Sequence, residues 1–146
     1  MRVLIIAVGK VKEKYLRTAV NDYLARIKRY ARVEEIELKD GDADEVRARF
    51  EKAIPDRSRV IALEVDGTSI SSEQLAEWVD DAEGSGVQSM VFLIGGSYGL
   101  PRDVSQAAHR RLSLSAMTLP HRLARLFLAE QIYRAFSISR GEPYSH

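Results

Sequence analysis

Apolar residues in this chain form short runs that alternate with segments of helical periodicity. Two runs, 3–8 and 90–94, are continuously apolar, as expected for strands that are covered on both faces. Between residues 33 and 39, apolar positions alternate with glutamates, a pattern that predicts an edge or half-exposed strand. Residues 60–65 predict another strand, and residues 112–114 predict a short fifth one.

Helices are expected between these strands. Residues 12–30 place apolar side chains at the i, i+3, i+4 spacing of an amphipathic helix. Capping residues, prolines and glycines delimit four more helices, near 42–54, 71–83, 103–109 and 120–138. This alternation predicts a single α/β domain, 1–146, with a mostly parallel sheet and helices on both faces.

The composition is that of a globular protein without disulfide or metal chemistry. Hydrophobic residues make up 45% of the chain and charged residues 29%. The sequence has no cysteine, which excludes disulfides and thiolate ligands, and its three histidines show no metal-ligand spacing. The apolar run 3–8 is too short to span a membrane. We therefore expect a soluble, cytoplasmic protein with no metal and no membrane partner.

Charge is segregated along the chain although the net charge is only +1. Residues 1–32 carry nine basic and two acidic side chains, residues 33–89 carry six and sixteen, and residues 90–146 carry seven and three. Such a chain can offer a basic face to a polyanion such as RNA. Solvated helix faces explain the same pattern equally well.

Three predicted loops follow the carboxyl ends of strands, where parallel α/β sheets bind ligands: 63–67, 94–101 and 114–121. Three glycines in the second loop allow the backbone to approach a ligand closely. Their spacing matches neither the dinucleotide-binding fingerprint nor the P-loop. The third loop mixes hydroxyl and apolar side chains, which suit an adenine-sized planar group. A tight turn and a buried strand end are the respective structural alternatives.

The last predicted helix has an apolar face wider than one side of a small sheet requires, which predicts a subunit interface. Arg122 and Arg125 lie in its first turns, where a cation opposes the helix dipole. Two arginines in that place indicate either an anionic ligand or simple solvation. Of the three histidines, His121 is the best placed for a ligand contact, because it lies at the junction of loop and helix.

Several segments taken together resemble one family of enzymes. These segments are 7–10, 94–96 with 99–100, 112–121, 130–135 and 143–144. They resemble the RlmH family of SPOUT methyltransferases, which are the large-subunit ribosomal RNA pseudouridine N3-methyltransferases. The resemblance covers the whole chain and is weakest in the acidic stretch 33–58. The family tail reads Pro-Tyr-His followed by a basic residue, whereas this chain ends in Pro-Tyr-Ser-His.

The resemblance implies a trefoil-knotted α/β fold, although the general rule for protein chains is against a knot. It implies an S-adenosylmethionine (SAM) cofactor, an obligate homodimer and methylation of N3 of a pseudouridine in 23S rRNA. The target would lie in a decoding-side stem-loop of the assembled ribosome. The cofactor-binding residues that it implies belong to the three loops: Leu63, Gly95, Leu114, Ser115, Ala116, Met117, Thr118 and Leu119.

The acceptor nitrogen of pseudouridine must lose a proton, so a general base or an anion-stabilising cation is expected near the transferred methyl group. We expect Tyr144 and His121 to position the substrate, and Arg125 and Arg140 to stabilise its anion or phosphate. His146 is a further candidate, since it corresponds to the family's tail histidine displaced by one position.

Two other functions fit parts of the sequence. An RNA-binding module without chemistry would use the basic N-terminal helix together with Arg122 and Arg125. A receiver-like signalling domain would use Asp66 as phosphoacceptor. That domain needs an acidic pair after the first strand and a lysine after the fifth, and residues 8–10 and 115–117 supply neither.

Overall fold

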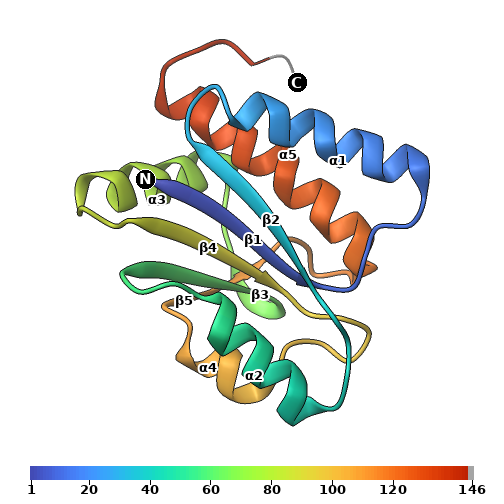
Figure 1. The fold of residues 1–146 in the computed structure, drawn as a ribbon. Helices are drawn as coiled ribbons and strands as arrows, with labels where there is room; N and C mark the ends of the chain where they lie inside the picture. Colours follow the sequence, from blue (N-terminus) through green and yellow to red (C-terminus); the bar gives the residue numbers. More distant parts are fainter. Residues whose placement is uncertain (145–146) are drawn as a thin grey trace.

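The computed structural model describes residues 1–144 and has an α/β architecture (Figure 1). Five strands and five helices alternate along the chain: β1 (Arg2–Val8), α1 (Lys14–Ile27), β2 (Arg32–Leu38), α2 (Ala43–Ala53), β3 (Ser58–Ser69), α3 (Ser72–Gly84), β4 (Ser89–Ile94), α4 (Arg102–Ala107), β5 (Arg110–Ser113) and α5 (His121–Ser139). The order of elements predicted from the sequence is therefore confirmed.

The strands form one sheet in the order β2-β1-β4-β3-β5, and all four pairings are parallel. The apolar strands β1 and β4 lie side by side in the middle, so that Ile5 pairs with Phe92. On its other side Ile5 pairs with Glu35 of β2, the edge strand that the alternating pattern predicted. The continuous apolar runs thus form the central strands, whose two faces are both covered, and the alternating segment forms an edge strand.

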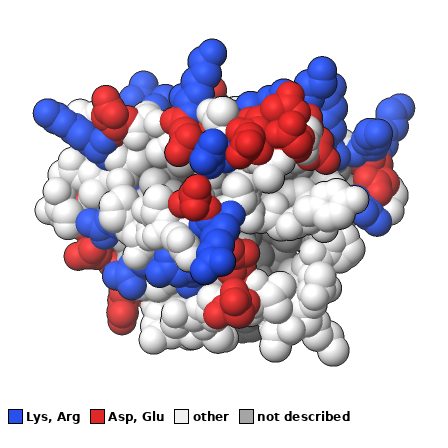
Figure 2. Space-filling model, turned by 90° about the horizontal axis from the view of Figure 1, so that it is seen from below, with Lys and Arg blue, Asp and Glu red and all other residues white. Residues whose placement is uncertain are grey.

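Helices cover both faces of the sheet, as predicted (Figure 1). One face packs against α1, α3 and α5 in a core that includes Ile27, Val79 and Leu128. The other packs against α2 and α4 through Phe50 and Val104. Figure 2 shows the α2 and α4 side, where acidic and basic side chains are interspersed rather than separated into patches.

Several element boundaries differ from the prediction. The Asp-Gly pair at 66–67 was expected to end β3, but the strand continues to Ser69. The pair lies between Leu63 and Thr68, where the pairing of β3 with β5 shifts register and then resumes. A Cβ on Gly67 would lie 2.8 Å from the carbonyl carbon of Arg111, so the close approach of β5 requires glycine there. Strand β5 begins at Arg110 rather than residue 112, and α1 spans 14–27 rather than 12–30.

Local sequence signals fix where two of the helices begin. Asp42 and Ser71 are the N-caps of α2 and α3, and each forms a capping box with the third helical residue, Glu45 or Gln74. The trefoil knot is not tested by the strand order and stays a prediction.

Candidate functional site

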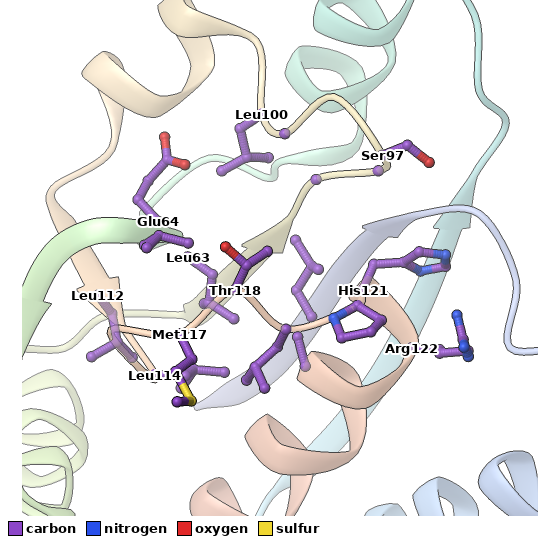
Figure 3. A pocket seen from close by; sticks show the side chains of 18 residues that line it. Leu63, Glu64, Ser97, Leu100, Leu112, Leu114, Met117, Thr118, His121 and Arg122 are labelled. Carbon is purple, nitrogen blue, oxygen red and sulfur yellow. The ribbon is translucent and has the colours of Figure 1, made fainter.

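A cavity of about 440 Å³ lies at the carboxyl ends of β3, β4 and β5 (Figure 3). The three loops marked in the sequence line it: Leu63, Glu64, Val65, Ile94, Gly95, Gly96, Ser97, Gly99, Leu100, Leu112, Leu114, Met117, Thr118, Leu119 and Pro120, together with His121, Arg122 and Ala124 of α5. Its size is typical of a pocket for a small molecule or cofactor. Six of the eight predicted cofactor residues line it; Ser115 and Ala116 lie in the same segment but not in the wall.

The glycine loop forms one wall of the cavity as a tight turn. The N–H of Gly99 donates to the carbonyl oxygen of Gly96 at 3.0 Å, and Gly99 has a φ of +79°, in the left-handed region. A Cβ on Gly95 would lie 2.3 Å from the carbonyl carbon of Gly99 and 2.5 Å from the nitrogen of Leu100. Glycine at position 95 therefore allows the turn to fold back on the end of β4.

The segment between β5 and α5 forms a second wall. The Ser113 hydroxyl donates to the Ser115 carbonyl oxygen at 3.0 Å, and the Met117 N–H donates to the Ser115 hydroxyl oxygen at 3.0 Å. Ser115 therefore shapes the loop instead of facing the cavity. Among residues 1–144, the N–H groups of Ala116, Thr118 and Leu119 donate to no protein acceptor. Backbone N–H groups without a protein acceptor, placed beside apolar side chains, can donate hydrogen bonds to a planar heterocycle.

His121, the first residue of α5, closes the cavity beside Gly9 of the β1–α1 loop (Figure 3). Its Nδ1 is buried, and within residues 1–144 it has no hydrogen-bond partner. Burial lowers the pKa of His121 below its ordinary value, and the charges of Arg125 and Arg122 lower it further. The neutral imidazole is therefore favoured at pH 7, and the ring lines the cavity.

Arg125 lies one turn after His121 but inside the protein, where its side chain is 0% exposed. Its guanidinium donates to the Gly9 carbonyl oxygen at 3.0 Å and to the carboxylates of Glu35 and Glu37 on β2. Arg17 of α1 binds the same two carboxylates. Burial alone would raise the pKa of Glu37, but the hydrogen bond and charge of Arg125 and the charge of Arg17 lower it. The structure thus places Arg125 in an internal ion-pair network that joins α5 to β1 and β2, and not where a phosphate reaches it.

Comparisons with known proteins show the family to which this chain belongs. The model of the family described as "Predicted SPOUT methyltransferase" matches residues 1–146. The chain belongs to the SPOUT methyltransferase family. It is 50% identical to a ribosomal RNA large subunit methyltransferase H of Sorangium cellulosum, over all of both chains. It is 46% identical to the protein of that name in Bacillus cytotoxicus and 42% identical to a putative one in Methanococcus maripaludis, in each case over 99% of both chains.

The solved structures include a probable methylase family protein of Haemophilus influenzae, which matches 95% of this chain with a TM-score of 0.56. The match covers 66% of that protein at 15% identity. At this identity the likeness concerns the fold, and it agrees with the α/β class predicted from the sequence.

Neither Arg140 nor Tyr144 of this SPOUT methyltransferase lines the cavity of its own chain. Helix α5 has 19 residues and so separates His121 from Arg140 by roughly 28 Å. Arg140 forms two hydrogen bonds to Glu83, at 3.0 and 3.1 Å. Tyr144 packs on the Tyr133 ring, with 4.9 Å between centroids. His146 lies outside the described residues.

The apolar face of α5 is exposed, as the sequence predicted. Leu123 and Phe127 are 39% and 40% exposed, and a hollow of about 560 Å³ lies between them and α1. Leu119 lines both this hollow and the cavity at the strand ends. The methyltransferase therefore carries an unpartnered apolar surface directly beside its candidate cofactor site.

The sequence marks Glu64, Ser97 and Leu100 only as members of the loops 63–67 and 94–101 and gives them no individual role, whereas it singles out Arg122. Glu64 lines the cavity and accepts a hydrogen bond from the Ser105 hydroxyl of α4 at 2.5 Å. In the sequence, the signal that could have marked Glu64 is its position as an acidic residue directly after the apolar run 60–63. Arg122 also lines the cavity, and it pairs with Glu13 at 2.7 Å.

Two expected absences can be compared with the structure. Within residues 1–144, no group of three or more potential ligand side chains is placed to hold a metal ion. No helix in this part of the chain is long and apolar enough to cross a membrane.

Proposed function

We propose that this SPOUT methyltransferase transfers a methyl group from SAM to N3 of a pseudouridine in 23S rRNA, on the assembled ribosome in the cytoplasm. The observation that carries the proposal is the cavity at the strand ends, built from the glycine turn, the 114–120 segment and His121. The substrate class, large-subunit ribosomal RNA, comes from the names of relatives that match the whole chain at 42–50% identity.

The cavity suits the cofactor in size and in chemistry. Leu63, Leu112 and Leu114 provide apolar walls for an adenine ring. The unused amides of Ala116, Thr118 and Leu119 provide hydrogen-bond donors for its nitrogens. Glu64 has a second carboxylate oxygen that is suited to ribose hydroxyls. SAM supplies a methyl group that its sulfonium already activates, so the protein mainly has to bind and orient the two reactants.

His121 is our candidate for the residue that contacts the reacting base. Its ring borders the cavity, its neutral form is favoured at pH 7, and its buried Nδ1 has no partner within the described chain. A neutral imidazole accepts a hydrogen bond or a proton from the acidic imide N3 of the base. Arg125, which we first expected to bind phosphate, instead holds the first turns of α5 against Gly9 and β2, and so keeps His121 in place.

We further propose that the protein acts as a homodimer joined through the apolar face of α5. In one chain Tyr144 contacts Tyr133 and Arg134 in the middle of α5 and does not line the cavity. The exposed face beside Leu119 gives a second subunit a place to dock next to the cavity. In this arrangement the tail of one subunit, with Arg140 and Tyr144, supplies groups to the site of its partner.

The test is tritium transfer from labelled SAM to ribosomes that lack the modification, followed by mapping of the labelled nucleotide. We expect label at a single pseudouridine of 23S rRNA, and none when that uridine has not been isomerised. Label found on protein or on free tRNA alone contradicts the proposal. Calorimetry with SAM provides an independent measurement, since an RNA-binding module without chemistry does not bind the cofactor.

A further inference from the structure

The tip of the glycine turn carries a tyrosine that folding does not use. Tyr98 is 98% exposed. Within residues 1–144, Tyr98 makes no hydrogen bond or aromatic contact through its side chain. In contrast, Tyr30 and Tyr133 both pack against other aromatic rings in the α1 and α5 layer. Removing the Tyr98 ring therefore costs the folded chain almost nothing.

The backbone that carries this tyrosine is nonetheless well defined. Residues 96–99 form a turn closed by the 3.0 Å hydrogen bond from Gly99 N–H to the Gly96 carbonyl oxygen. The same two glycines pair as an isolated antiparallel bridge, and Gly95 packs directly against residues 99 and 100. A ring on a constrained turn loses little conformational freedom when a partner binds it.

The turn stands between two hollows. Gly96, Ser97 and Gly99 line the candidate cofactor cavity on one side. With Tyr98, the same residues line a second hollow of about 390 Å³ on the other side, whose far wall is formed by Asp40, Asp42 and Val46. The turn therefore forms a wall that the two hollows share. The carboxylates of Asp40 and Asp42 in the second hollow repel phosphate. The hollow therefore suits the uncharged base of a nucleic acid better than its charged backbone.

We infer that Tyr98 is a substrate-binding residue that stacks on an unpaired nucleobase of the RNA beside the target nucleotide. The inference rests on the proposed function, since it assumes that rRNA is the substrate. Proteins that bind splayed-out RNA bases commonly stack them on exposed aromatic side chains, because every base offers a π-face. Tyr98 lines the second hollow, and its neighbours Ser97 and Gly99 line the candidate cofactor cavity, so that its exposed ring is placed for this contact.

The test compares Tyr98→Ala with Tyr98→Phe in the full chain. Binding to salt-washed large ribosomal subunits and to deproteinised 23S rRNA is measured by filter retention, and SAM binding by calorimetry. We expect Tyr98→Ala to bind the RNA roughly 5- to 100-fold more weakly and to raise KM with a small effect on kcat. Tyr98→Phe, which keeps the ring and loses the hydroxyl, should remain close to the wild type.

Each other outcome overturns the inference in a recognisable way. Equal RNA binding by Tyr98→Ala and wild type excludes stacking. A loss of SAM affinity instead assigns the ring to the cofactor, and a change of oligomeric state in sedimentation assigns it to the subunit interface. Because RNA binding is measured without turnover, the failure of methyl transfer by the wild type would refute the proposed function and leave the result for Tyr98 unaffected.

Discussion

Substituting Gly95 by alanine should damage the cofactor site far more than the same change at other glycines. The new Cβ would lie 2.3 Å from the Gly99 carbonyl carbon, and ordinary contacts begin at 3.4 Å, so the turn has to move by about 1 Å. The obstructing atoms are backbone, which no change of rotamer moves aside. We expect an overpacking cost of about 1–3 kcal/mol in the free energy of unfolding.

The same displacement moves one wall of the candidate cofactor cavity. We expect Gly95→Ala to weaken SAM binding roughly 10- to 100-fold, equivalent to about 1.4–2.7 kcal/mol of binding free energy. Two controls separate binding from stability. Gly84 has open space around it at the end of α3, so Gly84→Ala should leave both properties close to those of the wild type. Gly86 has a φ of +73° and open space, so Gly86→Ala should cost about 1–2 kcal/mol of stability and leave SAM affinity unchanged.

Urea unfolding gives the stabilities of these variants and calorimetry gives their SAM affinities. Wild-type affinity in Gly95→Ala would refute the role assigned to this turn, since the wall could then move without consequence for the ligand. Equal losses of affinity in Gly95→Ala and Gly86→Ala would attribute the effect to general instability.

Four further predictions concern α5 and the tail. Arg125→Met should lower the free energy of unfolding by about 1–3 kcal/mol, because it removes the buried guanidinium that binds Glu35 and Glu37 and leaves Arg17 as their remaining partner; urea unfolding at pH 7 measures the loss, and a loss below about 0.5 kcal/mol contradicts the network. The pKa of His121 is lowered from 6.5, so methyl transfer should be constant above pH 6.5 and fall below it as the imidazole is protonated. A pH–rate profile unchanged in His121→Asn would exclude His121 as the titrating group. Phe127→Glu should shift the protein to monomer in sedimentation without unfolding it, because the ring is 40% exposed in one chain; a persistent dimer would place the interface elsewhere. Tyr144→Phe should reduce methyl transfer on ribosomes and leave SAM affinity intact, and unchanged turnover would remove its catalytic role.

Sequence periodicity predicted the elements of this fold well because each strand and helix has a distinct environment. The run 90–94 is apolar at every position since β4 lies between β1 and β3 and beneath helices on both faces. Boundaries were less predictable where tertiary contacts override local signals. The Asp-Gly pair at 66–67 normally ends a strand, but here β5 pairs again beyond it, at Thr68 and Ser69.

The loops of the candidate site were predictable for a similar reason, since parallel strands bring their carboxyl ends to one edge of the sheet. What could not be predicted was which side chains in those loops face the cavity. Ser115 and Thr118 look alike in sequence, yet the Ser115 hydroxyl accepts the Met117 N–H within the loop while Thr118 lines the cavity. Such choices depend on hydrogen bonds inside a short loop, which periodicity does not report.

Charge was the least predictable property, and Arg125 shows why. The sequence placed two arginines near the start of α5, and both suggested an anionic ligand. In the structure Arg122 lines the cavity, whereas Arg125 is buried against two glutamates that lie 88 and 90 residues earlier in the chain. The acidic block of residues 33–89 therefore neutralises part of both basic blocks: β2 supplies carboxylates to Arg2 and Arg17 before it and to Arg125 after it. The segregated charge that suggested an RNA-binding face thus also joins α5, the helix that begins with His121, to β1 and β2.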